Sequence, residues 1–518
     1  MPEITQFRMT GYNPDIPPHE LPPDQWNTLV HMVPDRGVYS KAGGVFNHGA
    51  KTPDVSYLFN FQKDDADSVN QLDNFWLYAG DVSGTVKVYM HDAIDDTDTD
   101  ITLAGLYSSL RPNDFTGGVM NGFPFITVDS IANNSGNSEI QYWPGTATAS
   151  VPDPMVAMPN QQPSAGYVVS WARAHKNHIF AGNTVSIAFN GAPDEVIWSD
   201  AVAQGAGAPA TWIAAAGNEA GNVRLTASPG PVIDGISGPR DRFYVFKQGS
   251  TYAGEYIGGN EVYSFRKLTD NVGVLSRHNA EVVGQLMYLL TPDDVVQFDG
   301  FQFQTIVESK TRNAIFDAIY ATSVDPQDSF ITYRPDANEL WVCVPTASQR
   351  YSDLAYVYNT VHNSWGQRTL ESYRCADMGI KLDSQYGQQA LHMGGGDDDK
   401  QIHEIDRNNT DSDSANIAWQ VLREDLDFGD RNRLKIIKRI WPRFTSTGTP
   451  SINMAVGVRN NLNDAIAYSA NQAFTPGTSE WIDPIATGKY ISFRFNDTAA
   501  TIDTLWGFDV EWEWGGAW

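Results

Sequence analysis

The sequence predicts an all-β protein: a β-propeller with an additional C-terminal β-sandwich domain and an irregular N-terminal arm. Short runs of β-branched and aromatic residues are bounded throughout by Gly, Pro, Asn and Asp, which is typical of many short strands joined by turns. The 44 Gly and 28 Pro follow no collagen-like period. Hydrophobic residues make up 41% of the 518 residues, which is enough for a sizeable core.

Residues 1–40 are expected to form the arm. Prolines recur between positions 14 and 34 and prevent a regular helix there. The segment 24–36 carries Trp26, Leu29, Val30 and Met32 among polar residues. We therefore expect it to pack on another surface, such as that of a neighbouring subunit.

Residues 41–407 are expected to form the propeller, because strand pairs dominate this part of the chain. Residues 282–290 are expected to lead as one strand into 295–298, followed by a turn at Asp299–Gly300. The Ala/Gly-rich segment 201–220 is either a long loop or a short helix that covers a neighbour. The expected strand pairs are 75–79 with 85–90, 123–129 with 139–143, 178–182 with 195–200, 243–247 with 250–256, and 390–394 with 401–405, and 329–333, 339–344 and 354–358 form three successive strands.

An approximate repeat supports the propeller. VVQFDG (295–300), LAYVYNTVHNSW (354–365) and QIHEID (401–406) each place an apolar strand before an Asp or Asn turn. Four-stranded sheets repeated about every 40–60 residues are typical of propeller blades. The alternative is a stack of ordinary hairpins in sandwiches, and the repeat does not give the number of blades.

The polar segment 407–415 predicts a domain boundary, so residues 408–518 are expected to form the C-terminal β-sandwich, a platform-like domain. Five segments in this part alternate apolar and polar residues at a period of two, as half-buried strands do. They are 417–423, 435–443, 451–458, 490–495 and 504–513.

The formal charge of −27 and the pI of about 4.6 disfavour binding to phosphates and to anionic membranes. Sequence-specific DNA binding is not expected, although a duplex could slide along a negative wall as a passenger. Two cysteines exclude a disulfide framework, and Cys343 is expected to be a buried free thiol. No secretory signal and no apolar run of about 18 residues is found, so we expect no membrane span and folding in a cytoplasm.

No catalytic residue, cofactor site or metal site is predicted. The sequence lacks the G-x-S-x-G, H-E-x-x-H and Walker A patterns. His175 and His178 are three residues apart, but no second pair with ligand spacing appears in the sequence, which favours a surface or turn role over metal binding. The acidic segments 92–100 and 397–399 could bind Ca²⁺, but without EF-hand spacing solvated turns are favoured.

A cluster rich in Lys and Arg at 431–443 stands out against the acidic average. It is either a basic strip that docks an acidic neighbour or touches DNA, or an edge strand guarded against aggregation. The candidate partner-interface residues are Arg431, Arg433, Lys435, Lys438, Arg439, Trp512, Trp514 and Trp518.

The sequence between 180 and 518 resembles the tail nozzle (hub, or tail stabilisation) proteins of short-tailed double-stranded DNA bacteriophages. The resemblance rests on strand and turn motifs and not on catalytic ones. The motifs are EVIWSD (195–200), GISGPRDRFYVFK (235–247), STY (250–252), LTDNVGVLS (268–276), LTPDDVVQFDG (290–300), DLDFG (425–429), MAVGVR (454–459), GKYISFRF (488–495) and LWGFDVEW (505–512).

The resemblance implies a non-enzymatic β-propeller protein with further β domains. Six copies would form a tube at the distal end of the virion tail, assembled in the host cytoplasm, below a portal adaptor ring. Tail fibres or spikes would attach at the junction, and double-stranded DNA would leave through the central channel. The alternatives are a carbohydrate-binding or glycan-degrading propeller protein of a virion, and a fibre-anchoring adaptor, although adaptor proteins are mostly helical.

Overall fold

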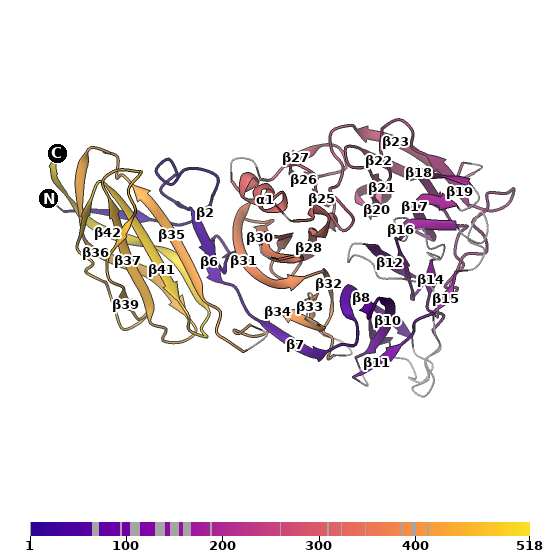
Figure 1. Cartoon of the computed structure of the whole chain (residues 1–518), viewed down its shortest axis with the longest axis horizontal. Helices are drawn as coiled ribbons and strands as arrows, with labels where there is room; N and C mark the ends of the chain where they lie inside the picture. The colour runs from indigo at the N-terminus through magenta and orange to yellow at the C-terminus, as the bar shows by residue number, and fades with distance from the viewer. Residues whose placement is uncertain are drawn as a thin grey trace.

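The computed structural model of the chain is almost entirely β (Figure 1). It describes residues 2–517 except 65–71, 94–95, 104–113, 130–139, 146–154, 159–166, 187–188, 260, 308–309, 323, 348, 385–386, 396–399 and 412–413. The helices among the described residues are short: η3 (Pro239–Asp241), α1 (Arg312–Ile319) and η4 (Pro326–Asp328). None of the described helices is long and apolar enough to cross a membrane.

In the described part of the chain, seven antiparallel four-stranded units follow one another around a ring and form a β-propeller. In chain order, the first blade holds β8 (Asp54–Asp64), β9 (Leu72–Val82), β10 (Thr85–Asp92) and β11 (Thr97–Asp100), the second β12 (Phe115–Met120), β13 (Phe123–Val128), β14 (Gln141–Tyr142) and β15 (Val156–Ala157), and the third β16 (Tyr167–His175), β17 (His178–Ser186), β18 (Phe189–Trp198) and β19 (Gly221–Arg224). The fourth blade holds β20 (Asp234–Gly238), β21 (Arg242–Phe246), β22 (Thr251–Tyr256) and β23 (Tyr263–Thr269), and the fifth β24 (Ala280–Val283), β25 (Leu286–Leu290), β26 (Val295–Phe298) and β27 (Phe303–Thr305). The sixth blade holds β28 (Phe330–Arg334), β29 (Glu339–Pro345), β30 (Ser352–Asn359) and β31 (Ser364–Tyr373), and the last β32 (Cys375–Ile380), β33 (Gln389–Gly394), β34 (Gln401–Ile405) and β7 (Val45–Ala50).

The ring closes on itself in two ways. The first strands of the blades contact one another in chain order, and β32 of the last blade contacts β8 of the first. The fourth strand of the last blade is β7, which comes from the N-terminal side of the propeller and pairs antiparallel with β34. The ring of blades is therefore closed within one chain, with no gap between the first and last blades.

The remaining strands form two packed sheets at the other end of the molecule, where both chain termini lie (Figure 1). A separate parallel pair joins β2 (Gly11–Tyr12) to β3 (Gln25–Trp26). One sheet holds β4 (Thr28–Val30), β35 (Trp419–Leu426), β41 (Tyr490–Asp497), β37 (Ile452–Arg459), β38 (Ala467–Tyr468) and β39 (Gln472–Phe474); the other holds β5 (Met32–Asp35), β6 (Val38–Lys41), β42 (Asp503–Ala517), β36 (Arg433–Ser446), β40 (Ala486–Gly488) and β1 (Glu3–Phe7).

One sheet runs through both parts of the molecule. The sixth blade, β28 to β31, continues through β5 and β6 into β42, β36 and β40, so that ten strands share one hydrogen-bonded sheet once β1 is included. The link between blade and sandwich is narrow, since β31 and β5 pair at Gln367 and Met32. Propeller and sandwich are thus joined by sheet hydrogen bonds as well as by covalent chain.

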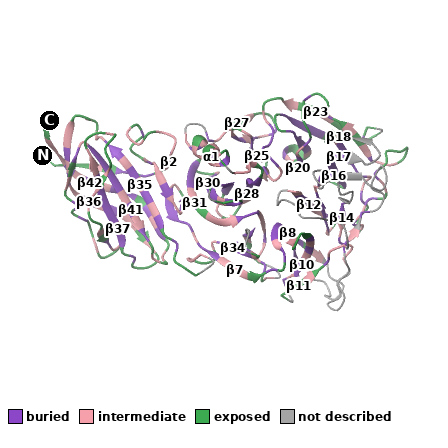
Figure 2. Ribbon diagram, viewed as in Figure 1, coloured by how far each residue is buried: buried purple, intermediate pink, exposed green. Residues whose placement is uncertain are grey.

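The N-terminal segment forms strands of the sandwich, where an irregular arm was expected. Trp26, Leu29 and Met32 are fully buried in the same cluster as the sandwich core. Trp26 lies 6.0 Å from Phe495 between ring centroids, edge to face. The apolar residues of 24–36 therefore pack on this chain's own C-terminal strands, and no neighbouring subunit is needed to cover them. Figure 2 shows buried stretches, in purple, along the C-terminal strands β35 and β41.

The expected strand pairs form with local differences. The segment 282–290 is broken into β24 and β25, because Gly284 adopts a φ of +62° and turns the chain. At the expected turn, Asp299 Oδ1 accepts hydrogen bonds from the N–H groups of Phe301 and Gln302, and Gly300 has a φ of +91°. The segment 201–220 is a loop whose Trp212 is buried against its own second and third blades.

Candidate functional site

A cavity of about 360 Å³ lies at the centre of the propeller. All seven innermost strands or the residues beside them line it, so it occupies the axis of the ring. The arginine, histidine and carboxyl side chains of its lining are Arg173, Asp234, His278, Glu281, Arg374 and Asp377.

Arg173 on β16 and Asp234 on β20 form a two-point ion pair across neighbouring blades. The Nε–Oδ1 and Nη2–Oδ2 distances are 3.1 and 2.8 Å. Asp234 also accepts a hydrogen bond of 2.8 Å from the N–H of Gly235. Burial alone would raise the pKa of Asp234, but Arg173 outweighs it and holds that pKa below its usual value. The pair is ionised and mutually compensated.

His278 joins three blades on the cavity wall. Its Nε2 lies 2.7 Å from the carbonyl oxygen of Phe115, and its backbone N–H donates to Asp234 at 3.4 Å. Burial, aided by the charge of Arg173, lowers the pKa of His278 to about 4. The ring is therefore neutral at pH 7, and its Nε2 carries the proton donated to the Phe115 carbonyl.

Glu281 on β24 and Asp377 on β32 are the cavity's two poorly compensated carboxyls. Burial, and then the charge of Asp377, raises the pKa of Glu281 to about 8. Burial raises the pKa of Asp377 to about 7, although the N–H of Asn60 donates to it at 2.7 Å. Two carboxyls that interact in a narrow space titrate as a pair and hold a proton near neutral pH.

The cavity thus combines a neutral ion pair with a proton-holding carboxyl pair. Such a set can bind a polar or cationic group and can exchange a proton with it. None of these residues was selected by the sequence analysis, because they are spread over four blades that lie far apart in the sequence. Asp234 directly precedes the GISGP motif, and that motif gives no sign that its neighbour faces Arg173.

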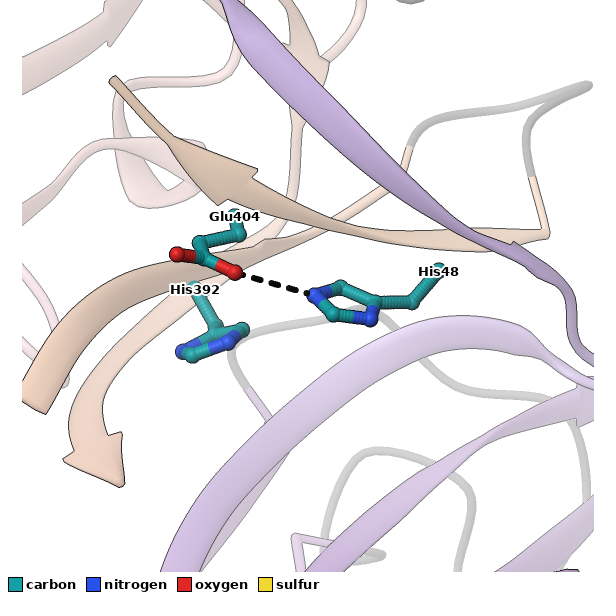
Figure 3. Close-up of side chains that lie close together, drawn as sticks. All are labelled: His48, His392 and Glu404. Atoms are coloured by element: carbon teal, nitrogen blue, oxygen red, sulfur yellow. Dashed lines mark ion pairs between the residues drawn. The ribbon is translucent and has the colours of Figure 1, made fainter. Parts of the chain in front are cut away.

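A second group of ionisable side chains lies in the closing blade (Figure 3). His48 on β7, His392 on β33 and Glu404 on β34 offer ligand atoms within 4.8 Å of one another. Glu404 Oε2 lies 3.4 Å from His48 Nε2, and Lys381 and Arg407 approach the same carboxylate at 3.1 and 2.8 Å. Burial alone would raise the pKa of Glu404, but the contacts with His48, Arg407 and Lys381 hold it at about 2.

This closing-blade cluster suits an ion-pair network better than a divalent cation. Two cationic side chains already compensate Glu404, and they would repel a metal ion. The Nε2 atom of His392 is directed at the N–H of Leu382, 3.4 Å away, and its Nδ1 atom lies 3.1 Å from the Ala390 carbonyl oxygen. We assign the cluster to fastening β7 onto the last blade.

The basic strip is largely neutralised within the chain. Arg431, Lys438 and Arg439 form ion pairs with Asp427, Glu513 and Asp483 at 3.2, 2.7 and 2.8 Å. β36 pairs with β42 on one side and with β40 on the other, so it is not an edge strand. Neither a free basic surface nor a guarded edge is therefore present at 431–443.

The remaining interface candidates divide between core and surface. Lys435 is fully buried and donates to the carbonyl oxygen of Lys489 at 2.8 Å, and Trp512 is 3% exposed, so neither side chain can reach a partner. Arg433 stacks over the ring of Trp514 at 4.4 Å, and both are half-buried. Trp518 lies outside the described residues.

The remaining sequence predictions concern the two acidic segments, the pair of histidines and Cys343. Within 92–100, Thr97–Asp100 forms β11, and Asp98 pairs with Lys51 at 2.9 Å, so this part is not a solvated loop. Residues 397–399 lie outside the described residues. His175 and His178 are buried and contact Ser237 and Tyr263 at 2.8 and 3.0 Å, so a surface role is wrong for both. They face each other across the turn between β16 and β17, so the predicted turn position is confirmed. Cys343 is a buried free thiol, as predicted.

Comparison with known proteins gives no family. No family model matches the sequence, and no curated protein matches it. Among solved structures the chain is similar to a catalytically inactive variant of virginiamycin B lyase from Staphylococcus aureus, with 9% identity, a TM-score of 0.31, and coverage of 60% of this chain and 93% of that one.

Two further structures are similar at the same level. For an extracellular domain of a hybrid two-component system from B. thetaiotaomicron, identity is 10% and the TM-score is 0.41; coverage is 86% of this chain and 54% of that one, about half its length. For an exported protein from Bacteroides fragilis, identity is 12% and the TM-score is 0.31, with coverage of 59% and 93%. The propeller assignment rests on the strand order described above.

Proposed function

We propose that this chain is a structural subunit of the tail nozzle of a short-tailed double-stranded DNA bacteriophage. Six copies would form a tube below the portal adaptor ring, with tail fibres or spikes at the junction, and the genome would leave through the tube. The proposal assigns the chain no catalytic role. The proposal comes from the strand and turn motifs of residues 180–518. The structural observation that supports it is the pairing of N-terminal strands with strands from the far end of the chain.

The molecule is suited to mechanical load. The sheet that continues from the sixth blade through β5 and β6 into β42 connects propeller and sandwich by hydrogen bonds. The N-terminal strands β1, β4 and β7 pair with β42, β35 and β34 from the far end of the chain. A force must break these pairings to unravel either part, which favours a load-bearing role, while among the described strands the two parts pair directly at β31 and β5.

The genome would pass between copies and not through a propeller. The axial cavity of about 360 Å³ corresponds to about twelve waters at about 30 Å³ each, which is far too little for a duplex. A ring of copies joined by heterologous contacts can enclose a wider channel. With a charge of −27 on each subunit, an acidic lumen would repel DNA phosphates and let the duplex slide.

Electron microscopy and mass measurement test the proposal. The purified chain mixed with its adaptor ring is expected to give six-fold rings in negative stain, and antibodies to the chain are expected to label the distal tail of virions. A chain that stays monomeric with the adaptor and is absent from the tail would contradict the proposal. Release of reducing sugar from host polysaccharide by the chain would favour the glycan-degrading alternative instead.

A further inference from the structure

The axial cavity contains more negative charge than its own residues compensate. Arg173 is satisfied by Asp234, as described above. Arg374 Nη1 donates to Ser56 Oγ at 3.0 Å, and Arg374 Nη2 lies 3.6 Å from Asp54. Both cavity arginines are thus engaged with other groups. No described cationic side chain forms an ion pair with Glu281 or Asp377, although the charge of Arg173 acts on Glu281 without direct contact.

Of these two carboxyls, Glu281 has fewer hydrogen-bond partners than Asp377. Asp377 accepts the N–H of Asn60, whereas no hydrogen bond or ion pair reaches the carboxylate of Glu281 from any described residue. Glu281 is half-buried in the cavity wall. A carboxylate withdrawn from water is costly unless a partner reaches it, and native structures usually supply a counter-charge or a ligand. The open volume beside Glu281 leaves room for one.

The rest of the lining indicates which kind of cation fits. Tyr57, Phe59 and Phe330 are buried on the wall, with Val119, Ile331 and Met378 beside them. A bare metal ion gains nothing from such groups, and Ca²⁺ takes six to eight oxygen ligands where this wall offers two carboxyls outside the Arg173–Asp234 pair. An alkyl ammonium ion fits this lining better, because its carbons pack on the apolar walls and its charge can face an aromatic ring.

We propose that the axial cavity of the propeller binds a small organic cation, an amine or a diamine, between Glu281 and Asp377. An ammonium group donates hydrogen bonds to the Glu281 carboxylate and replaces the proton that this carboxyl otherwise holds. A diamine spans both carboxyls. This inference is independent of the proposed tail function, because the cavity is complete within one chain.

Calorimetric titration of the full-length chain with 1,4-diaminobutane at pH 8.5 tests the inference. We expect saturable binding with one ligand per chain, and we expect Glu281→Gln and Asp377→Asn each to weaken it by about tenfold or more, since each removes a charged hydrogen bond. Glu480→Gln makes the same charge change at an exposed site in the sandwich and is expected to leave binding unchanged. Thermal unfolding of each variant checks that it is folded.

Three further measurements separate the outcomes. Uncharged 1,4-butanediol is expected not to bind, and at pH 7.5 titration in buffers of different ionisation enthalpy is expected to show proton release as Glu281 ionises. Ca²⁺ and K⁺ are expected not to compete with the diamine. Equal diamine affinity in Glu281→Gln, equal binding of the diol, or a site that takes Ca²⁺ and refuses the diamine would each overturn the inference.

Discussion

His48 Nε2 lies 3.4 Å from the carboxylate of Glu404, so a residue near the N-terminus is held against the third strand of the last blade. The contact lies where β7 closes the ring, and both side chains are buried. Glu404 also gathers Lys381 and Arg407, so a single carboxylate anchors three positive or proton-accepting groups.

We expect Glu404→Ala to destabilise the chain by about 3 kcal/mol, because removing one partner leaves buried charges without compensation. Hydrogen exchange should rise first in β7. Denaturant unfolding and exchange mass spectrometry measure the two effects. Glu255→Ala is a matched control, since Glu255 is exposed and its pair with Arg242 should contribute at most about 1 kcal/mol. Equal losses in both variants would contradict the closing role of Glu404.

The Arg173–Asp234 pair gives a second prediction. Arg173→Met leaves Asp234 buried without its partner and is expected to cost about 3–5 kcal/mol in unfolding free energy. Asp234→Asn should cost a comparable amount, and the double variant should be more stable than the sum of the single losses predicts. Denaturant unfolding of the four proteins measures the coupling. Additive losses would mean that the two side chains act independently.

Glu281 makes stability depend on pH in a defined direction. Its pKa rises from the ordinary 4.5 when unfolded to about 8 when folded, so the folded state binds the proton more tightly. Its contribution to stability is therefore present at low pH and is lost as the pH rises between these two values. We expect Glu281→Gln to be more stable than the parent at pH 9, by roughly 1–3 kcal/mol, and similar to it at pH 5. Melting curves across this range, without added amine, measure the difference. A parent chain as stable at pH 9 as the variant would contradict the prediction.

The N-terminal strands provide a packing test. Trp26 is fully buried between the sandwich sheets, and Trp26→Ala is expected to cost about 3–5 kcal/mol. Trp506 is 51% exposed, so Trp506→Ala should cost less than about 1 kcal/mol. Thermal or denaturant unfolding compares the two. A small effect of Trp26→Ala would mean that residues 1–41 are not part of the sandwich core in solution.

Strand positions could be predicted because their signals are local. The repeat at 295–300, 354–365 and 401–406 marks the third strands β26, β30 and β34 of three successive blades. In two of them the terminal Asp299 and Asn359 cap the next turn through their side-chain oxygens. Alternation and turn residues lie within a few positions of each other, and a single sequence contains that information.

Long-range pairings could not be predicted in the same way. β7 closes the ring with β34, and β4 enters the sandwich beside β35, but neither N-terminal segment carries a signal for its distant partner. The grouping of the cavity residues could not be predicted for the same reason, because Arg173, Glu281 and Asp377 lie in different blades. Lys435 was selected for its charge, although its burial depends on strands far along the chain.

A reconstruction of the intact virion tail tests the proposed function most directly. We predict six copies of this chain around the tail axis below the adaptor ring, each with its propeller closed by β7, and a DNA-wide channel bounded by several copies. Density that placed the chain off the axis, or left it out of the tail altogether, would contradict the proposal.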